Sequence, residues 1–219
     1  MNRRLIVKSF VQCVGIAALA LSAVVNAQTA VVTPAASVSA PDELVKKLSN
    51  DVLDKIRGDK EIQGGNFKKL SDFVDATVMP SVNFERMTAL SVGRAWRTAT
   101  PEQQKKLMAE FRALLLRTYS GALTEVKDET LRMKPLRAAA EDTDVIVRSE
   151  IVRKRGEPVQ LDYRMEKAAT AWKIYDVNVA GLWLVESYRN QFSQEVNAKG
   201  LDGLIATLVE KNKKLDQAK

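Results

Sequence analysis

The spacing of apolar residues changes twice along the chain, and each change indicates a new kind of secondary structure. Between residues 41 and 126, apolar side chains recur at every third or fourth position, which is typical of helices that bury one face. From residue 129 to residue 179 they alternate with polar ones, as in strands with one buried face. After residue 182 the helical spacing returns. The pattern predicts helices, then a sheet, then helices again.

Proline and glycine mark the ends of the helices expected in the first half of the chain. One helix begins at Pro41 and ends before Gly58, and a second covers about residues 66–77. A third, shorter helix is expected over residues 83–93. Each carries apolar residues on one side and therefore needs a partner layer.

The strongest local signal lies at the start of a fourth helix. Thr100 can accept a hydrogen bond at the helix N-terminus, Pro101 suits the first helical position, and Gln103 completes a capping box. Behind them a broad apolar stripe extends to Val126. We expect this long helix to be the central helix of the fold.

Four strands are expected between residues 129 and 179, because polar turns interrupt the alternating pattern three times. The turns cover residues 140–143, 155–158 and 167–170. Short connections between consecutive strands favour an antiparallel meander. The predicted class is α+β, with a curved four-stranded antiparallel sheet covered by helices, an arrangement that tends to be hollow.

The last part of the chain predicts two more helices, over residues 182–196 and 201–215. Gly200 and Gly203 mark the joint between them. Residues 41–215 are therefore expected to form a single domain, which is long enough to bury a substantial core.

The first 27 residues have the pattern of a cleaved signal peptide. Three basic residues precede an uncharged run from Phe10 to Val25, and Ala27 is a suitable residue for cleavage. A membrane anchor is the alternative, but the run of 16 residues is shorter than the roughly 20 that a spanning helix needs. We expect export to the periplasm, cleavage after Ala27 and a flexible leader over residues 28–40.

The composition excludes several kinds of chemistry. The chain has no His, and its single Cys, Cys13, lies in the predicted signal peptide. Zinc sites built from His and Cys, and nucleophiles activated by His, are therefore excluded, and no cofactor is expected. Loss of the signal peptide removes three basic and no acidic residues, so the net charge falls from +7 to +4. Export and interspersed charges argue against nucleic-acid binding.

Three sequence blocks occur in a defined order along the predicted domain. They are Ala99-Thr100-Pro101 followed by Gln103, Gln104, Phe111 and Tyr119; Trp172 with Tyr175-Asp176-Val177 and Gly181; and the segment from Lys199 to Leu204. With these blocks, from about Pro41 to Val209, the chain resembles the MlaC family, the periplasmic phospholipid-binding proteins of the Mla pathway, also called the toluene-tolerance family.

The resemblance implies a fold similar to nuclear-transport-factor-2-like (NTF2-like) domains, with a deep apolar cavity between sheet and helices for acyl chains. It implies a carrier that is not an enzyme and that moves phospholipid between two membrane complexes to maintain outer-membrane asymmetry. These partners are an outer-membrane lipoprotein–porin complex and an inner-membrane ABC transporter with an MCE-domain component. Contacts with them would be transient, and a monomer suits a shuttle.

A lipid carrier needs an apolar cavity, because about thirty acyl methylenes exposed to water cost on the order of 25 kcal/mol. Flexible Met side chains adapt to chains of different length. The residues expected to contact lipid are Met79, Phe84, Met87, Leu115, Tyr119, Leu123, Met133, Val147, Leu161, Tyr163, Met165, Tyr175 and Val177. Any one of them could instead fill the core. Tyr163→Glu or Leu161→Asp is expected to abolish lipid retention while the fold survives.

Polar residues supply two further candidate groups. Arg94, Trp96 and Arg97 form a candidate partner-docking set, although Trp96 could equally pack onto the core. Arg164 and Lys173, with the two arginines of that set, are candidate neighbours of a lipid phosphate, because a guanidinium group matches phosphate oxygens.

Two other functions stay open at the level of sequence. NTF2-like domains include isomerases and lyases, and a site of that kind here would use Asp162, Tyr163, Tyr175 and Asp176. The other is a periplasmic adaptor that binds only proteins, which predicts no bound lipid and a complex weakened by salt.

Overall fold

The protein is described by a computed structural model that covers residues 40–139 and 141–217. The expected signal peptide, its cleavage site after Ala27 and nearly all of the leader lie outside these residues. The described part belongs to one compact unit that starts at Ser37. Within it, no helix is long and apolar enough to cross a membrane.

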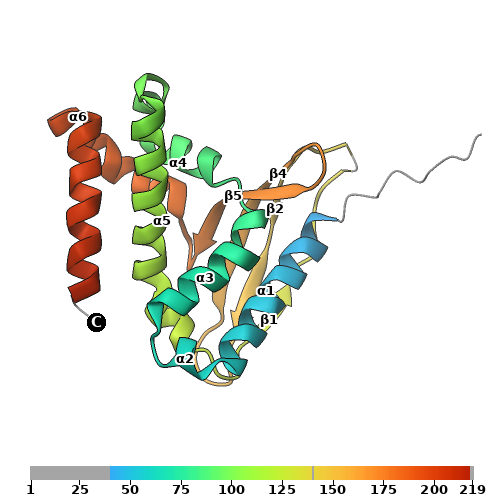
Figure 1. Ribbon diagram of the computed structural model, residues 1–219. Coiled ribbons are helices and arrows are strands. Elements are labelled where there is room, and N and C mark those ends of the chain that lie inside the picture. The colour runs from blue at the N-terminus through green and yellow to red at the C-terminus, as the bar shows by residue number, and fades with distance from the viewer. Residues whose placement is uncertain (1–39, 140, 218–219) are drawn as a thin grey trace, which may run out of the picture. The chain divides into compact units, whose positions relative to one another are not determined.

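Helices make up the first half of this unit (Figure 1). They are α1 (Pro41–Gly58), α2 (Lys60–Gln63), α3 (Phe67–Thr77), the 3-10 helix η1 (Met79–Ser81), α4 (Phe84–Val92), the 3-10 helix η2 (Gly93–Thr98) and α5 (Pro101–Thr124). The four predicted helices are confirmed as α1, α3, α4 and α5. The capping box is also confirmed: the backbone N–H of Gln103 donates to Thr100 Oγ1 at 3.2 Å, and the backbone N–H of Thr100 donates to Gln103 Oε1 at 3.0 Å.

The short helix α2 was not predicted from the apolar spacing. Asp59 caps it by accepting hydrogen bonds from the backbone N–H groups of Glu61 and Ile62. The same carboxylate pairs with Lys55 on α1 and Lys69 on α3. The hydrogen bond from Lys55 holds the pKa of Asp59 well below its usual range. Asp59 therefore fixes the junction of three helices.

The sheet has six strands, so the prediction of four was wrong. The strands are β1 (Thr130–Met133), β2 (Asp144–Val147), β3 (Ser149–Val152), β4 (Val159–Lys167), β5 (Trp172–Val179) and β6 (Leu182–Trp183). Their order is β1-β3-β4-β5-β6, with β2 also on β4, and every pair is antiparallel. The predicted antiparallel pairing is thus confirmed, but β1 pairs with β3 and β2 pairs with β4, so the six strands are not a meander of consecutive neighbours.

Two local features account for the additional strands. β2 and β3 both pair with β4, and Arg148 lies between them in the sequence. The break in the strand at Arg148 makes two strands where the alternating pattern predicts one. At the other end, Ala180 and Gly181 both have positive φ values, 51° and 90°, and form a two-residue hairpin turn. The turn pairs Val179 with Leu182, so the last helix begins at Leu184 and not at Leu182.

The final helix, α6 (Leu184–Gln217), consists of two halves that meet at Gly200. Gly200 has a φ of 72° and a non-helical ψ, which confirms the predicted joint. At Gly203 an added Cβ would overlap the Cβ of Lys199, so glycine allows the second half to start close to the first. The second half runs beside α5 (Figure 1), where Asn212 Nδ2 donates to the Glu110 carbonyl oxygen at 2.9 Å.

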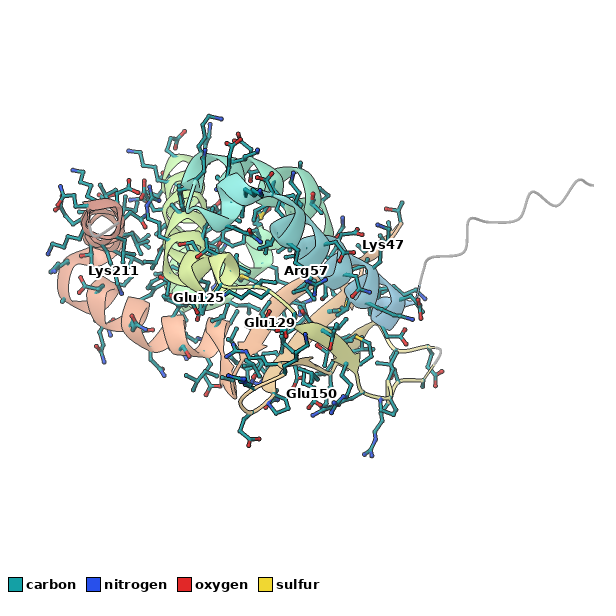
Figure 2. All side chains as sticks on the ribbon, turned by 90° about the horizontal axis from the view of Figure 1, so that it is seen from below. Lys47, Arg57, Glu125, Glu129, Glu150 and Lys211 are labelled. Atoms are coloured by element: carbon teal, nitrogen blue, oxygen red, sulfur yellow. The ribbon has the colours of Figure 1, made fainter. Side chains whose placement is uncertain are left out.

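Helices cover one face of the sheet, as the apolar pattern predicts. Helix α1 packs against β1 and β2, and α4 and α6 pack against β5. A charged contact supports the first of these interfaces: the Arg57 guanidinium on α1 donates to the carbonyl oxygen of Glu129, next to β1 (Figure 2). The sheet and its covering helices together enclose the apolar interior.

Replacement of Thr100 by Ala tests the capping box. We expect the free energy of unfolding to fall by about 1 kcal/mol, because the N–H of Gln103 loses its acceptor at the start of α5. Urea unfolding followed by circular dichroism measures the change. Lys105→Ala, at an exposed position one turn further on, is the control and should stay within about 0.5 kcal/mol of the wild type. Equal losses in both variants would contradict the assignment.

Candidate functional site

The apolar interior is divided among three clusters of buried side chains. The first lies between α4, α5 and α6, where the Phe111 ring packs edge-on against Tyr188 and Phe192 with centroids 4.9 and 5.1 Å away. The second lies between α1 and the sheet, and the third joins α1, α2, α3 and α5. Half-buried Val82 and Val177 contact both the first and the second cluster.

The third cluster shares no side chain with the other two among the described residues. A domain of this size usually has one contiguous core with smaller satellites. Here, apolar side chains that keep partial exposure lie around the buried centres of all three clusters. We call the boundaries between the three clusters the seams. They are apolar on both sides, which is the chemistry that an acyl chain needs.

Most of the residues expected to contact lipid belong to these clusters. The first contains Met87, with Phe84, Leu115, Tyr119 and Val177 packed against it; the second contains Val147, Tyr163 and Met165, with Met133, Leu161 and again Val177; the third has Leu123 at its margin. Met79 and Tyr175 belong to none of the three. Lipid contact by each residue stays a prediction.

Tyr163 joins the sheet to α1. Its side chain is 8% exposed, and its hydroxyl lies 3.2 Å from Ser49 Oγ. Burial raises the pKa of Tyr163 to about 12, although the hydrogen bond to Ser49 acts in the opposite direction. The phenol is therefore neutral at any physiological pH and presents an uncharged surface to the second cluster.

Tyr175 lies in a polar environment. The register between β4 and β5 shifts next to it, between Arg164 and Met165. Its hydroxyl donates to Asp144 Oδ1 at 2.8 Å, and the guanidinium carbon of Arg86 lies 3.6 Å from its ring centroid. Burial raises the pKa of Tyr175 to about 12. Arg86 also pairs with Glu166 and Asp144, so this side chain is part of a charged network.

Asp176 is a second buried polar centre. It is 1% exposed and accepts hydrogen bonds from Arg164 at 3.0 Å, from the N–H of Val177 and from the N–H of Val185 at the start of α6. Burial raises the pKa of Asp176, and these hydrogen bonds oppose the shift. Arg164 also lies 4.1 Å over the Trp183 ring. Asp176 therefore connects the sheet to α6.

Arg164 and Lys173, the candidate neighbours of a lipid phosphate, both have partners inside the protein. Arg164 is paired with Asp176, and Lys173 Nζ donates to the carbonyl oxygen of Pro80. Both basic groups already have partners within the protein. Their expected role beside a head group would require these contacts to open.

The four groups of the candidate enzyme site have separate hydrogen-bond partners. Asp162 accepts from the N–H of Ser149 and from Gln160, while Tyr163, Tyr175 and Asp176 contact Ser49, Asp144 and Arg164 respectively. No hydrogen bond joins any two of the four. Within residues 40–139 and 141–217, no cluster of three or more acidic, His or Cys side chains could hold a metal.

The candidate docking residues of η2 differ in their exposure. Arg94 and Arg97 are exposed, whereas Trp96 is half-buried and packs against the first cluster. The carbonyl oxygen of Trp96 accepts a hydrogen bond from Gln104 Nε2 on α5 at 3.3 Å. Trp96 therefore attaches η2 to the core, and partner docking stays a prediction for all three residues.

Two pockets stand out on the described part of the chain. One, of about 510 Å³, lies along α6 and includes Lys199, Gly203 and Lys211. The other, of about 400 Å³, lies between the end of α4, η2 and the first half of α6. None of the residues expected to contact lipid lines either pocket.

The family of the chain is decided by comparison with known proteins. A model of the MlaC protein family matches residues 46–210. The chain belongs to the MlaC family. This confirms the resemblance carried by the three sequence blocks.

Two curated members of the MlaC family are each 23% identical to this chain. The toluene tolerance protein ttg2D of Pseudomonas putida aligns over 163 residues, 74% of this chain and 75% of its own length. The intermembrane phospholipid transport system binding protein MlaC of Haemophilus influenzae aligns over 168 residues, 74% of this chain and 78% of its own length.

A solved structure is more similar. It is a phospholipid-binding protein from Ralstonia solanacearum in complex with a phospholipid, with 46% sequence identity and a TM-score of 0.78. The match covers 80% of this chain and 98% of that one. The α+β fold with an open antiparallel sheet is thereby confirmed as that of an MlaC-type protein.

The sequence reasoning left α1 and α3 out of the expected lipid site. Val52 on α1, and Phe67, Phe73 and Val74 on α3, are half-buried around the third cluster. The apolar side of α3 was visible in the sequence as spacing at three and four residues. What the spacing could not indicate was that this side meets a cluster separate from the rest of the core.

The buried hydroxyl of Tyr163 predicts a specific alkaline titration. The ionisation of Tyr163 is measured as the difference in absorbance at 295 nm between the wild type and Tyr163→Phe. As the pH is raised, this difference should increase with a midpoint near pH 12. In the unfolded chain Tyr163 ionises near pH 10, and in the folded chain near pH 12. Between these two values the free energy of unfolding of the wild type should therefore fall by roughly 1.4 kcal/mol for each pH unit. Below pH 10 this hydroxyl contributes no pH dependence. A midpoint near 10 would show that it is open to solvent.

Proposed function

We propose that this chain is a phospholipid carrier whose acyl chains insert along the seams between the three apolar clusters. The observation that supports this most strongly is the Ralstonia solanacearum relative, 46% identical and solved with a phospholipid bound. At this identity, over 98% of the relative, the interior of the two proteins has a common architecture. Phospholipid binding is therefore the function best supported for this chain.

Physical chemistry favours the seams over the two pockets as the acyl-chain site. The pocket along α6 includes three Lys side chains and Glu210, and the other includes two Arg side chains, so an acyl chain in either pocket would lie beside charged groups. An acyl chain gains about 0.8 kcal/mol for each CH₂ removed from water, and it gains this only against apolar surface. The half-buried side chains at the margins of the clusters provide such surface. Insertion of lipid would separate the clusters and complete their burial.

The second part of the proposal concerns location and partners. The expected signal peptide would deliver the chain to the periplasm, where it would receive lipid from one membrane complex and pass it to the other. The outer-membrane lipoprotein–porin complex and the inner-membrane MCE-domain transporter are the partners that the family implies. Transfer of this kind maintains outer-membrane asymmetry and requires no bond to be made or broken. The carrier would act as a monomer, without catalysis and without a cofactor.

Lipid extraction from the exported, natively purified chain tests the proposal. Mass spectrometry of the material released on denaturation should show diacyl phospholipid at close to one or more molecules per chain. Release of no lipid, together with binding to proteins that salt weakens, would favour the protein-only adaptor. Turnover of a small carbonyl compound by a lipid-free protein would favour an isomerase or lyase.

Leu161→Asp should abolish lipid retention. Leu161 is half-buried at the margin of the second cluster, so a carboxylate there would face an acyl chain without a partner. Tyr163→Glu is a poorer test, because it would place a charge at a position that is 8% exposed and would threaten the fold itself.

Leu182→Asp is the matched control. Leu161 pairs with Val179, and Val179 pairs with Leu182, so the two leucines lie in one row across the sheet. Leu182 is 67% exposed and belongs to none of the three clusters. The Leu182→Asp variant should therefore retain as much lipid as the wild type. Equal lipid content in Leu161→Asp and Leu182→Asp would place the acyl chains elsewhere.

A further inference from the structure

A pocket of about 400 Å³ concentrates positive charge at the junction of α4, η2 and α6. Its polar lining consists of Arg94, Arg189, Ser193 and Asn197, and no acidic side chain lines it. The first of these residues comes from η2, and the other three come from α6. Its apolar lining, Val92, Ala95 and Val196, belongs to the first cluster, and the pocket contains none of the residues assigned to acyl chains.

The two arginines of this pocket differ from the arginines of α1, α4 and α5, which all pair with a carboxylate. Arg86 and Arg117 each have a carboxylate partner. Within the described residues, neither the Arg94 nor the Arg189 side chain makes a hydrogen bond or an ion pair, even though Glu186 lies only three positions before Arg189. Two unpaired guanidinium groups in one pocket repel each other, and a bound anion would remove that cost.

The backbone brings these groups together in a defined way. Gly93 has a φ of 73°, which L residues rarely adopt, and it turns the chain from α4 into η2. A Cβ at Gly93 would lie 3.6 Å from Arg189 Nε, so the guanidinium group rests directly beside the main chain. Ser193 and Asn197 follow Arg189 at intervals of four residues and therefore lie on the same side of α6.

We propose that this pocket binds a phosphate group, either as inorganic phosphate or as the phosphate of a lipid head group. The planar forks of Arg94 and Arg189 match the oxygens of phosphate, and Ser193 and Asn197 supply uncharged donors. The volume of about 400 Å³ accommodates the anion together with the start of an ester substituent. The site does not require acyl chains to bind in the seams.

Titration with inorganic phosphate tests the site on the exported chain. The Nε–Hε signals of Arg94 and Arg189 in nuclear magnetic resonance spectra should shift along one binding curve. Arg94→Gln and Arg189→Gln should each weaken phosphate affinity about tenfold or more. Arg189→Lys keeps the charge but loses the fork, and should weaken it by a smaller factor.

Arg155→Gln is the matched control. Arg155 is exposed in the turn between β3 and β4 and does not line the pocket, so phosphate affinity should stay at the wild-type value. Equal affinity in all of these proteins, or an equal loss in Arg155→Gln, would overturn the proposal. Circular dichroism of each variant confirms that the fold is unchanged.

Cosedimentation with phosphatidylglycerol vesicles distinguishes the two sources of phosphate. If the lipid head group is the ligand, Arg94→Gln and Arg189→Gln reduce vesicle binding about tenfold, and inorganic phosphate competes with vesicles for the wild type. If free phosphate is the ligand, vesicle binding is the same in all variants while the titration still separates them. The lipid content of the purified chain is an independent readout, so failure of this site would leave the carrier proposal standing.

Discussion

The carrier function depends on one packing constraint: the helices cover the sheet without joining their buried side chains into a single core. Three clusters form in its place, and the third shares no side chain with the others among the described residues. The apolar side chains at the margins of the clusters are only partly buried, so they keep surface that an apolar ligand can cover. Apolar ligands such as lipid acyl chains gain free energy when they are buried against such surfaces.

Polar contacts between elements hold this arrangement in place. Asp176 connects β5 to the start of α6 and to Arg164, while Arg117 and Asp216 connect α5 to the end of α6 through two hydrogen bonds of 2.9 Å. Asp59 connects α1 to α3 through ion pairs with Lys55 and Lys69. These polar side chains belong to none of the three clusters, so we expect their contacts to persist when lipid enters the seams.

Sequence reasoning succeeded where a local rule determines the structure. The Thr100–Gln103 capping box and the joint at Gly200 depend on side chains a few positions apart, and both are present. It failed at Leu182, because the apolar spacing alone does not reveal the two-residue turn at Ala180 and Gly181 that places Leu182 in an edge strand. Tyr175 was assigned to the apolar site from its place in an alternating strand. The register shift beside it, and its hydrogen bond to Asp144, depend on partners that periodicity does not reveal.

The most direct test is a crystal structure of the exported chain with the lipid that copurifies with it. The seam account predicts electron density for acyl chains between the sheet and the helices α1, α3 and α5, in contact with Leu123, Met133 and Leu161. It also predicts that the three clusters move apart around the chains while the contacts of Asp176 and Asp59 persist. Acyl-chain density in either charged pocket, with the three clusters packed as they are here, would contradict the account.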